Sequence, residues 1–274
     1  MPLTLMYITN DPAVALIAEK HGVDRIWIDL ETKGKELRQK NMNTVKSHHS
    51  ISDIGIIAPR LTKSELMVRV NAWDEESVDE VERVLEAGAQ RIMLPMWKTM
   101  EEVDAFLKVV NRRVPTTLLL ETKEAVEILD QVLEHPLVDE IHIGLNDLHL
   151  SYGLSFMFEL LANGTVEALC KKISAKGISY GFGGIARIGG GLLPAEHVIM
   201  EHARLGSTVA ILSRSFCDIN ASMSLEKIDE LFRENIRKIR EYEEYAAGCA
   251  FRIWEENKVT VAQKVATIVA GKGV

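Results

Sequence analysis

The chain has 274 residues, of which 47% are hydrophobic and 26% are charged, and its formal net charge is −8. This length fits one large α/β barrel or two small domains, and the composition is ordinary for a globular protein. The acidic balance without an offsetting basic run argues against nucleic-acid binding, and no apolar run approaches the length of a membrane span.

Three cysteines, Cys170, Cys217 and Cys249, lie far apart in the sequence. Their spacing and odd number suit a reducing cytosol better than a disulfide framework or a zinc knuckle. The first residues, MPLTLMYITNDP, lack the basic segment and the long apolar run of a signal peptide. We therefore expect a cytoplasmic protein.

Short apolar strands alternate with helical segments along the chain. The expected strands are residues 3–9, 25–31, 66–71, 91–96, 118–121, 140–147, 178–185 and 208–213. Helix-start signals stand between them: Asp11 before Pro12, and capping boxes at Ser77 with Glu80 and at Thr99 with Glu102. Residues 32–53 form a polar insertion with a helix expected after Asn43, and residues 149–164 are expected to be a long connector.

Eight strands alternating with helices, without a compositional break, predict a single closed (β/α)8 TIM barrel over residues 1–246. No G-x-G-x-x-G follows the first strand, which disfavours an open nucleotide-binding sheet. Residues 247–274 are a surplus helical extension. The apolar stripe of its segment VAQKVATIVA is expected to pack on a partner subunit or to cap the barrel, so we expect a homo-oligomer.

Two of the expected strands end in carboxylates, at Glu121 and Asp147. The helix between them has one apolar stripe, so the unit is βαβ and its strands should be parallel neighbours. Both carboxylates would then point into the mouth where barrels of this kind bind ligands. Two close carboxylates repel unless one is protonated or both share a cation. Hard oxygen ligands favour Mg²⁺ or Mn²⁺, which we expect as the cofactor.

Other charged residues also stand at strand ends: Glu31, Arg69, Arg187 and Arg214. Arg69 presents a planar fork suited to a carboxylate. A metal and Arg69 together can hold a 2-oxo acid at both ends, and the metal can stabilise the enolate formed when a carbon–carbon bond breaks.

The chain resembles the HpcH/HpaI aldolase and citrate lyase family over roughly residues 20 to 215. The resemblance rests on the segments RIWIDLE, VRVN, AGAQRIMLPM, LLLETKEAVEILDQVL and VDEIHIGLNDL. It implies a metal-dependent TIM barrel that makes or breaks C–C bonds next to pyruvate, assembled as a trimer or hexamer. It further implies Glu121 and Asp147 as metal ligands, and Arg69 with the turn residues Gly144, Leu145 and Asn146 as the substrate-binding part.

The chain departs from the family pattern around the expected base. Thr32 stands where the family has a histidine after the strand-two glutamate, here Glu31. The insertion after it carries His48 and His49, which we expect to serve as catalytic acid/base groups together with Glu31. Arg187 and Arg214 lie beyond strands seven and eight, where we expect them to bind an anionic end of the substrate.

The leading hypothesis is therefore a class II aldolase-like C–C lyase acting on a 2-oxo acid and an aldehyde or anionic acceptor. One alternative is a lyase for a CoA thioester of the citrate or malyl type. Another is a Schiff-base enzyme with Lys123 as the nucleophile. A third is a protein that binds 2-oxo acids without catalysis because its base is lost.

Overall fold

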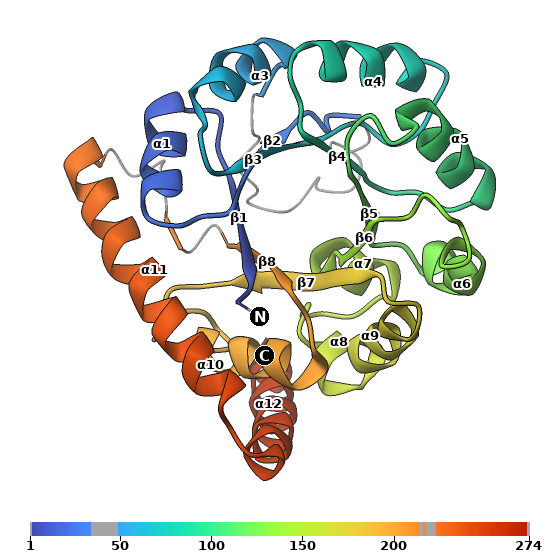
Figure 1. The fold of residues 1–274 in the computed structure, drawn as a ribbon. Helices are drawn as coiled ribbons and strands as arrows, with labels where there is room; N and C mark the ends of the chain where they lie inside the picture. The colour runs from blue at the N-terminus through green and yellow to red at the C-terminus, as the bar shows by residue number, and fades with distance from the viewer. Residues whose placement is uncertain (1, 34–48, 214–215, 218–222, 273–274) are drawn as a thin grey trace.

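The computed structural model describes residues 2–33, 49–213, 216–217 and 223–272, and it forms a closed barrel of parallel strands paired in chain order (Figure 1). The strands are β1 (Thr4–Ile8), β2 (Arg25–Asp29), β3 (Glu65–Arg69), β4 (Arg91–Leu94), β5 (Thr116–Leu120), β6 (Glu140–Ile143), β7 (Ser179–Ile185) and β8 (Val209–Leu212). The single (β/α)8 barrel expected from the sequence is confirmed.

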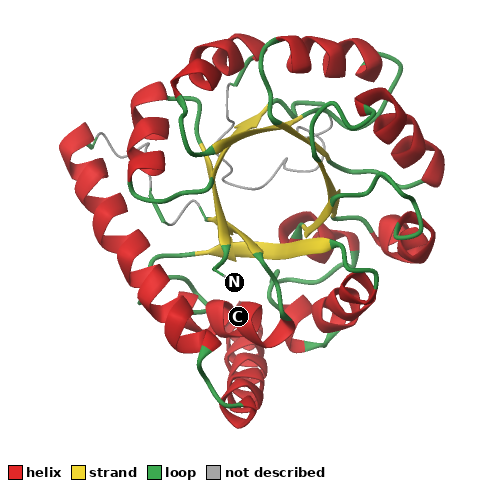
Figure 2. Cartoon of the chain, in the orientation of Figure 1, coloured by secondary structure: helices red, strands yellow, loops and turns green. Residues whose placement is uncertain are grey.

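Helices form a ring outside the strands (Figure 2). They are α1 (Pro12–Lys20), α3 (Ile51–Ile57), η1 (Ala58–Arg60), α4 (Ser77–Glu86), α5 (Met100–Val110), α6 (Lys123–Val132), α7 (Leu145–Ser151), α8 (Glu159–Ala162), α9 (Thr165–Ala175), α10 (Ala195–Leu205), α11 (Leu225–Ala247) and α12 (Phe251–Lys272). Residues 149–164, expected to be a connector, contain the end of α7 and all of α8. Residues 44–48, where the expected helix would begin, lie outside the described residues.

Two of the three helix starts follow their sequence signals. Asp11 accepts hydrogen bonds from the first turn of α1, and the capping box of Thr99 with Glu102 is present at α5. The box expected at Ser77 and Glu80 is wrong, because α4 already begins at Ser77 and Glu80 bonds to Asn71 instead. A tertiary contact with Asn71 therefore engages Glu80, which the local sequence pattern had assigned to the helix cap.

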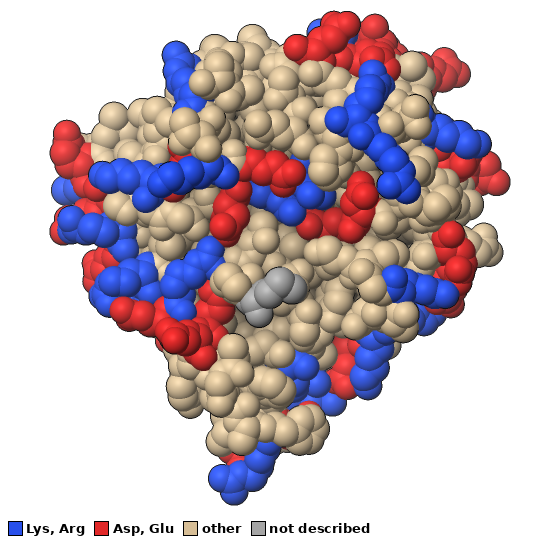
Figure 3. Space-filling view, in the orientation of Figure 1, with Lys and Arg blue, Asp and Glu red and all other residues tan. Residues whose placement is uncertain are grey.

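The end of the barrel where the strands begin is closed by ion pairs. Arg25 contacts Glu65 at 2.6 Å and Glu140 at 2.7 Å, and Arg91 contacts Glu65 at 2.9 Å. Figure 3 shows acidic and basic side chains meeting over the barrel axis at this end. Above them an apolar layer fills the interior, formed by Met6, Trp27, Met67, Met93, Leu119 and Val209. Ligands can therefore enter only at the opposite mouth.

The start of β1 is tied to α11, near the other end of the chain. Arg240 donates to the carbonyl oxygen of Leu3 at 2.6 Å and pairs with Asp24 at 2.8 Å, while Glu243 accepts from the amide of Leu3. With β8 paired to β1, these contacts close the barrel.

The C-terminal helix α12 packs against α8 and α10 of its own barrel. Asn257 donates to Glu201 at 2.8 Å and accepts from His197 at 2.6 Å, and Val261 and Val265 are buried. Part of the apolar stripe of α12 therefore packs against its own barrel. A role of this stripe in an oligomer stays a prediction. None of the helices in the described ranges is long and apolar enough to cross a membrane.

Gly181 lies where β7 and β8 approach most closely. A Cβ atom there would lie 2.0 Å from the carbonyl oxygen of Val209. We expect Gly181→Ala to destabilise the fold by at least about 2 kcal/mol, because the strands must separate to admit the methyl group. Gly55→Ala is the matched control, since that exposed site in α3 has open space; it should stabilise by roughly 0.5–1 kcal/mol. Urea unfolding of both variants measures this, and equal stabilities would contradict it.

Candidate active site

Glu121 and Asp147 lie on neighbouring segments at the barrel mouth. Glu121 directly follows β5, and β5 pairs in parallel with β6, as the βαβ pattern predicted. Strand β6 ends at Ile143, earlier than expected, so Asp147 lies in the first turn of α7 and not in the strand. The amide of Gly144 donates to the carbonyl oxygen of Leu120 at 3.0 Å, which holds the start of α7 against the end of β5.

The Glu121 side chain is buried and fixed on two sides. Its Oε1 accepts from the amide of Met96 at 3.0 Å, and Met96 adopts a left-handed backbone with φ of 56°. A Cβ atom at position 144 would lie 2.9 Å from both Cβ and Oε2 of Glu121. Gly144 is therefore required by the glutamate beside it. A strained residue and a glycine together orient one carboxylate.

Burial raises the pKa of Glu121 well above its usual range, and the nearby charge of Asp147 raises it further. The positive charge of Arg69 opposes these effects only in part. Among the residues that the structure describes, Arg69 therefore does not fully compensate the charge of the two carboxylates. This is the electrostatic condition that a bound cation relieves.

Arg69, at the end of β3, is held by carboxylates of β2. Its Nε and Nη2 donate to the two oxygens of Asp29 at 2.9 and 2.8 Å, and its Nη1 lies 3.3 Å from Glu31. Burial alone would lower the pKa of Arg69, but the charges of Asp29 and Glu31 hold it above its ordinary value. The guanidinium also lies 5.1 Å from the ring centre of Trp27.

Asp29 is a site residue that the sequence analysis missed, because it was counted only as part of a buried strand. A usable signal was the period-2 alternation of Arg25, Trp27 and Asp29, which places all three on the interior face. Asp29 takes two of the five guanidinium N–H groups and Glu31 faces a third nitrogen position. The N–H groups through which Arg69 could contact a substrate carboxylate are those of its two Nη atoms.

The turn after Glu31 is braced by Asn71. Its Oδ1 accepts from the amides of Thr32 at 2.9 Å and Lys33 at 3.0 Å, and its Nδ2 donates to Glu80 at 2.7 Å. Burial raises the pKa of Glu80. Thr32, which occupies the expected position of a histidine base, thus belongs to a fixed turn.

The remaining expected site residues divide into several environments. His49 lies at the mouth, where its Nδ1 accepts from the amide of Asp29 at 3.0 Å. Leu145 is buried against β7, since a Cβ atom at Gly183 would lie 2.7 Å from its Cδ1. Asn146 is exposed on the first turn of α7.

Arg187, just beyond β7, is exposed and makes no ion pair with any residue that the structure describes. Because it is exposed, Arg187 needs no protein carboxylate to offset burial, and its contact with an anionic end of the substrate stays a prediction. Lys123 is exposed at the first position of α6, whereas a Schiff-base lysine is activated by desolvation or a neighbouring cation. His48 and Arg214 lie outside the described residues.

The mouth suits a hard divalent cation. Glu121 and Asp147 supply carboxylate oxygens, and the shared negative charge described above favours such an ion. In the described part of the chain, no three His, Cys, Asp or Glu side chains gather closely enough to hold a metal alone. Water or substrate oxygens would have to complete the coordination, which is the usual arrangement for Mg²⁺.

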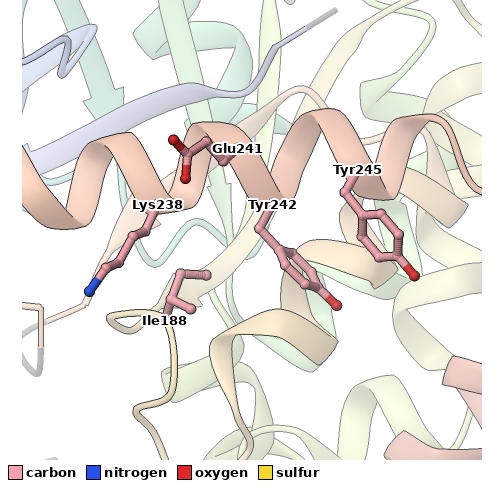
Figure 4. Close-up of a pocket in the computed structure, with 5 residues that line it drawn as sticks. All are labelled: Ile188, Lys238, Glu241, Tyr242 and Tyr245. Atoms are coloured by element: carbon pink, nitrogen blue, oxygen red, sulfur yellow. The ribbon is translucent and has the colours of Figure 1, made fainter.

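A groove of about 400 Å³ lies elsewhere, on the outer surface of α11 and the loop after β7 (Figure 4). Its lining residues are Ile188, Lys238, Glu241, Tyr242 and Tyr245. None of these is a candidate site residue, and the groove contains neither the carboxylate pair nor Arg69. The chemistry is therefore assigned to the mouth.

A parallel (β/α)8 barrel with carboxylates and one arginine at its mouth defines a class of enzyme-like barrels. Residues 3–175, more than half of the chain, match the family model described as HpcH/HpaI aldolase/citrate lyase. The chain belongs to the HpcH/HpaI aldolase/citrate lyase family. Comparison with curated proteins finds no match.

Solved structures of this family share the fold at low sequence identity. An HpcH/HpaI aldolase/citrate lyase family protein from Burkholderia cenocepacia J2315 is 17% identical with a TM-score of 0.62, covering 88% of this chain and 94% of the other. An HpcH/HpaI aldolase from Desulfitobacterium hafniense DCB-2 is 15% identical with a TM-score of 0.59 (88% and 93% covered). A citrate lyase from Burkholderia xenovorans LB400 is 15% identical with a TM-score of 0.57 (98% and 94% covered).

Removing the charge of Asp147 should stabilise the metal-free protein. Because the pKa of Glu121 is higher in the folded protein than its ordinary value of 4.5, its protonation stabilises the fold. This stabilisation is complete below pH 4.5 and is lost as the pH rises through the raised pKa. In Asp147→Asn the repulsion is absent, so the melting temperature in EDTA at neutral pH should rise, by on the order of 1 kcal/mol in free energy.

The same variant should lose the stabilisation that Mn²⁺ gives the wild-type protein. Asp130→Asn, which removes an exposed carboxylate paired with Lys172 on the outside of the barrel, is the control and should show neither effect. A lower melting temperature for Asp147→Asn in EDTA would contradict the repulsion.

Proposed function

We propose that this protein is a divalent-metal-dependent lyase that makes or breaks a C–C bond adjacent to a 2-oxo acid of the pyruvate type. The observation that carries the proposal is the arrangement at the mouth, where the charges of Glu121 and Asp147 repel each other beside Arg69, whose guanidinium is held by Asp29. Membership of an aldolase and lyase family supports the same reaction class.

Each residue has a proposed role. Glu121 and Asp147 hold Mg²⁺ or Mn²⁺, which when bound acts as a Lewis acid toward the keto oxygen. Arg69 binds the substrate carboxylate through its terminal N–H groups and favours the negative charge of the enolate that forms when the C–C bond breaks. Asp29 and Glu31 orient the guanidinium and keep it charged.

The far end of the substrate is proposed to be anionic. Arg187 is exposed beyond β7, at the end of the barrel where the other candidate residues lie. An unpaired guanidinium there would favour an acceptor aldehyde that carries a carboxylate or phosphate. Gly144 admits the substrate beside Glu121, and Asn146 on the exposed turn of α7 is proposed to contact it. Assembly into a homo-oligomer is proposed from the family membership and from the part of α12 that stays exposed.

The test is the cleavage of 4-hydroxy-2-oxo acids, measured as the rate at which pyruvate forms. Activity that EDTA abolishes and Mg²⁺ or Mn²⁺ restores supports the proposal. Cleavage of citramalyl or malyl CoA thioesters alone would support the CoA lyase, and inactivation by borohydride with substrate would support Lys123. Metal-dependent oxalate binding without turnover of any of these substrates would identify a non-catalytic binder.

The substitution Arg69→Lys tests whether the planar shape of the guanidinium matters in addition to its positive charge. A lysine keeps the positive charge but cannot bond to both oxygens of Asp29 and offer a second edge to the substrate. We expect kcat/KM to fall by about ten- to a hundredfold, the equivalent of a charged hydrogen bond, with Mn²⁺ affinity nearly unchanged. Arg113→Lys, at an exposed pair with Glu82, is the control for the same chemical change. Wild-type kinetics in Arg69→Lys would remove this residue from the mechanism.

A further inference from the structure

Beyond the end of β4, two side chains take over the pairing with the segment after β5. The backbone pairing of the two neighbouring strands extends to Leu94 (Figure 1). After it, the amide of Met96 donates to Oε1 of Glu121 at 3.0 Å. The carbonyl oxygen of the next residue, Trp97, accepts from the hydroxyl group of Thr122 at 3.0 Å. Two consecutive residues after β4 are thus held by two consecutive side chains after β5, one acting as acceptor and the other as donor.

The turn at Met96 needs such support because its backbone is strained. Its φ of 56° lies in the left-handed region, which is unfavourable for a residue with a Cβ atom. A conformation of this kind persists only where the surrounding structure imposes it. On one side, the ring of Pro95 fixes its own φ. On the other side, the side chain of Trp97 is buried in the core and its carbonyl group is bound by Thr122.

The hydroxyl group of Thr122 is itself fixed in direction. Thr122 is buried and is the N-cap residue of α6, where its Oγ1 accepts from the amide of Ala125 at 3.1 Å. A carbonyl oxygen can only accept, so the hydroxyl hydrogen of Thr122 must point to Trp97. The start of α6 is therefore tied to the turn after β4 by a single side chain.

This tie distinguishes the two carboxylate oxygens of Glu121. Oε1 is bonded to the amide of Met96, whereas Oε2 lies 2.9 Å from the position that a Cβ atom on residue 144 would take. Gly144 directly precedes α7, the helix that carries Asp147. Oε2 is thus the oxygen on the side of α7. If the Met96 amide moved, the carboxylate would lose the bond that defines its rotation.

We propose that Thr122 is a positioning residue for Glu121. By holding the carbonyl group of Trp97, Thr122 keeps the left-handed turn at Met96 in place, and the N–H group of this turn orients the carboxylate for a divalent cation. The proposal deepens the lyase function above and rests on Glu121 as a metal ligand. In this role Thr122 acts through the backbone of the neighbouring loop and contacts neither the metal nor the substrate.

Two substitutions of Thr122 separate its hydroxyl group from its shape. Thr122→Val keeps the branched shape and loses both hydroxyl bonds, whereas Thr122→Ser keeps a hydroxyl group that can form both. We expect the Mn²⁺ affinity of Thr122→Val, measured by electron paramagnetic resonance of the free ion, to fall about tenfold, as for the loss of one hydrogen bond. Thr122→Ser should bind Mn²⁺ within about twofold of the wild-type protein.

The control is Thr99→Val, which removes a helix cap on the neighbouring helix α5. Thr99 is exposed, and its Oγ1 accepts from the amide of Glu102 at 3.3 Å. Both valine variants should unfold at lower urea concentration because each loses a cap, but only Thr122→Val should bind Mn²⁺ weakly. Wild-type Mn²⁺ affinity in Thr122→Val would overturn the proposal. Equally weak binding by Thr99→Val would overturn it too, because loss of any cap would then suffice.

Hydrogen exchange of the Met96 amide in EDTA tests the positioning without metal or turnover. We expect this amide to exchange about tenfold faster in Thr122→Val than in Thr99→Val, because its partner Glu121 is no longer held in place. Equal exchange rates in the two variants would contradict the proposal. If the variants behave as expected but the wild-type protein cleaves no substrate, the lyase function fails while the role of Thr122 stands. If metal-dependent cleavage is found but Thr122→Val binds Mn²⁺ normally, only the role of Thr122 fails.

Discussion

The mouth of this barrel depends on an imbalance of charge. Among the described residues, the carboxylates of Asp29, Glu31 and Glu121 act on the buried guanidinium of Arg69, and Asp147 adds its charge beside Glu121. Burial limits the screening of their repulsion by water. The fold tolerates this imbalance because much of the site is held by the backbone. The left-handed Met96 and the absence of a Cβ at position 144 fix Glu121 in its buried position, so the repulsion cannot be relieved by a change of rotamer.

Arg69 illustrates how one residue can serve both architecture and chemistry. Its Nε and Nη2 groups are bonded to Asp29, across the β2–β3 pair, and its charge acts on Glu121 at the mouth. The barrel interior supports this arrangement from below. Trp27 lies beneath the guanidinium, and the ion pairs of Arg25 and Arg91 close the far end, so charge at the mouth is separated from charge at the base by an apolar layer.

Much of the fold follows from the sequence, because period-2 and period-3.6 patterns report directly on which faces are buried. The βαβ unit of Glu121 and Asp147 was predictable for this reason. The same alternation places Asp29 on the interior face, but its role in the site was not predictable, since that role comes from Arg69, a partner distant in sequence. Glu80 was assigned wrongly because a capping box considers only the first turn of a helix, whereas Glu80 bonds to Asn71, nine residues earlier in the loop after β3. The placement of His49 beside β2 depends on where β1 stops, which no local pattern specifies.

The contact of Leu3 with Arg240 has a consequence for the synthesis of the chain. The first strand of the barrel needs β8 as its neighbour and α11 as its anchor, and both are synthesised about 200 residues after β1. Until then β1 has one open edge, and the loop that must close spans most of the polypeptide. The barrel therefore closes only after β8 and the part of α11 up to residue 240 have left the exit tunnel, and until then the nascent chain presents an unpaired strand edge to chaperones.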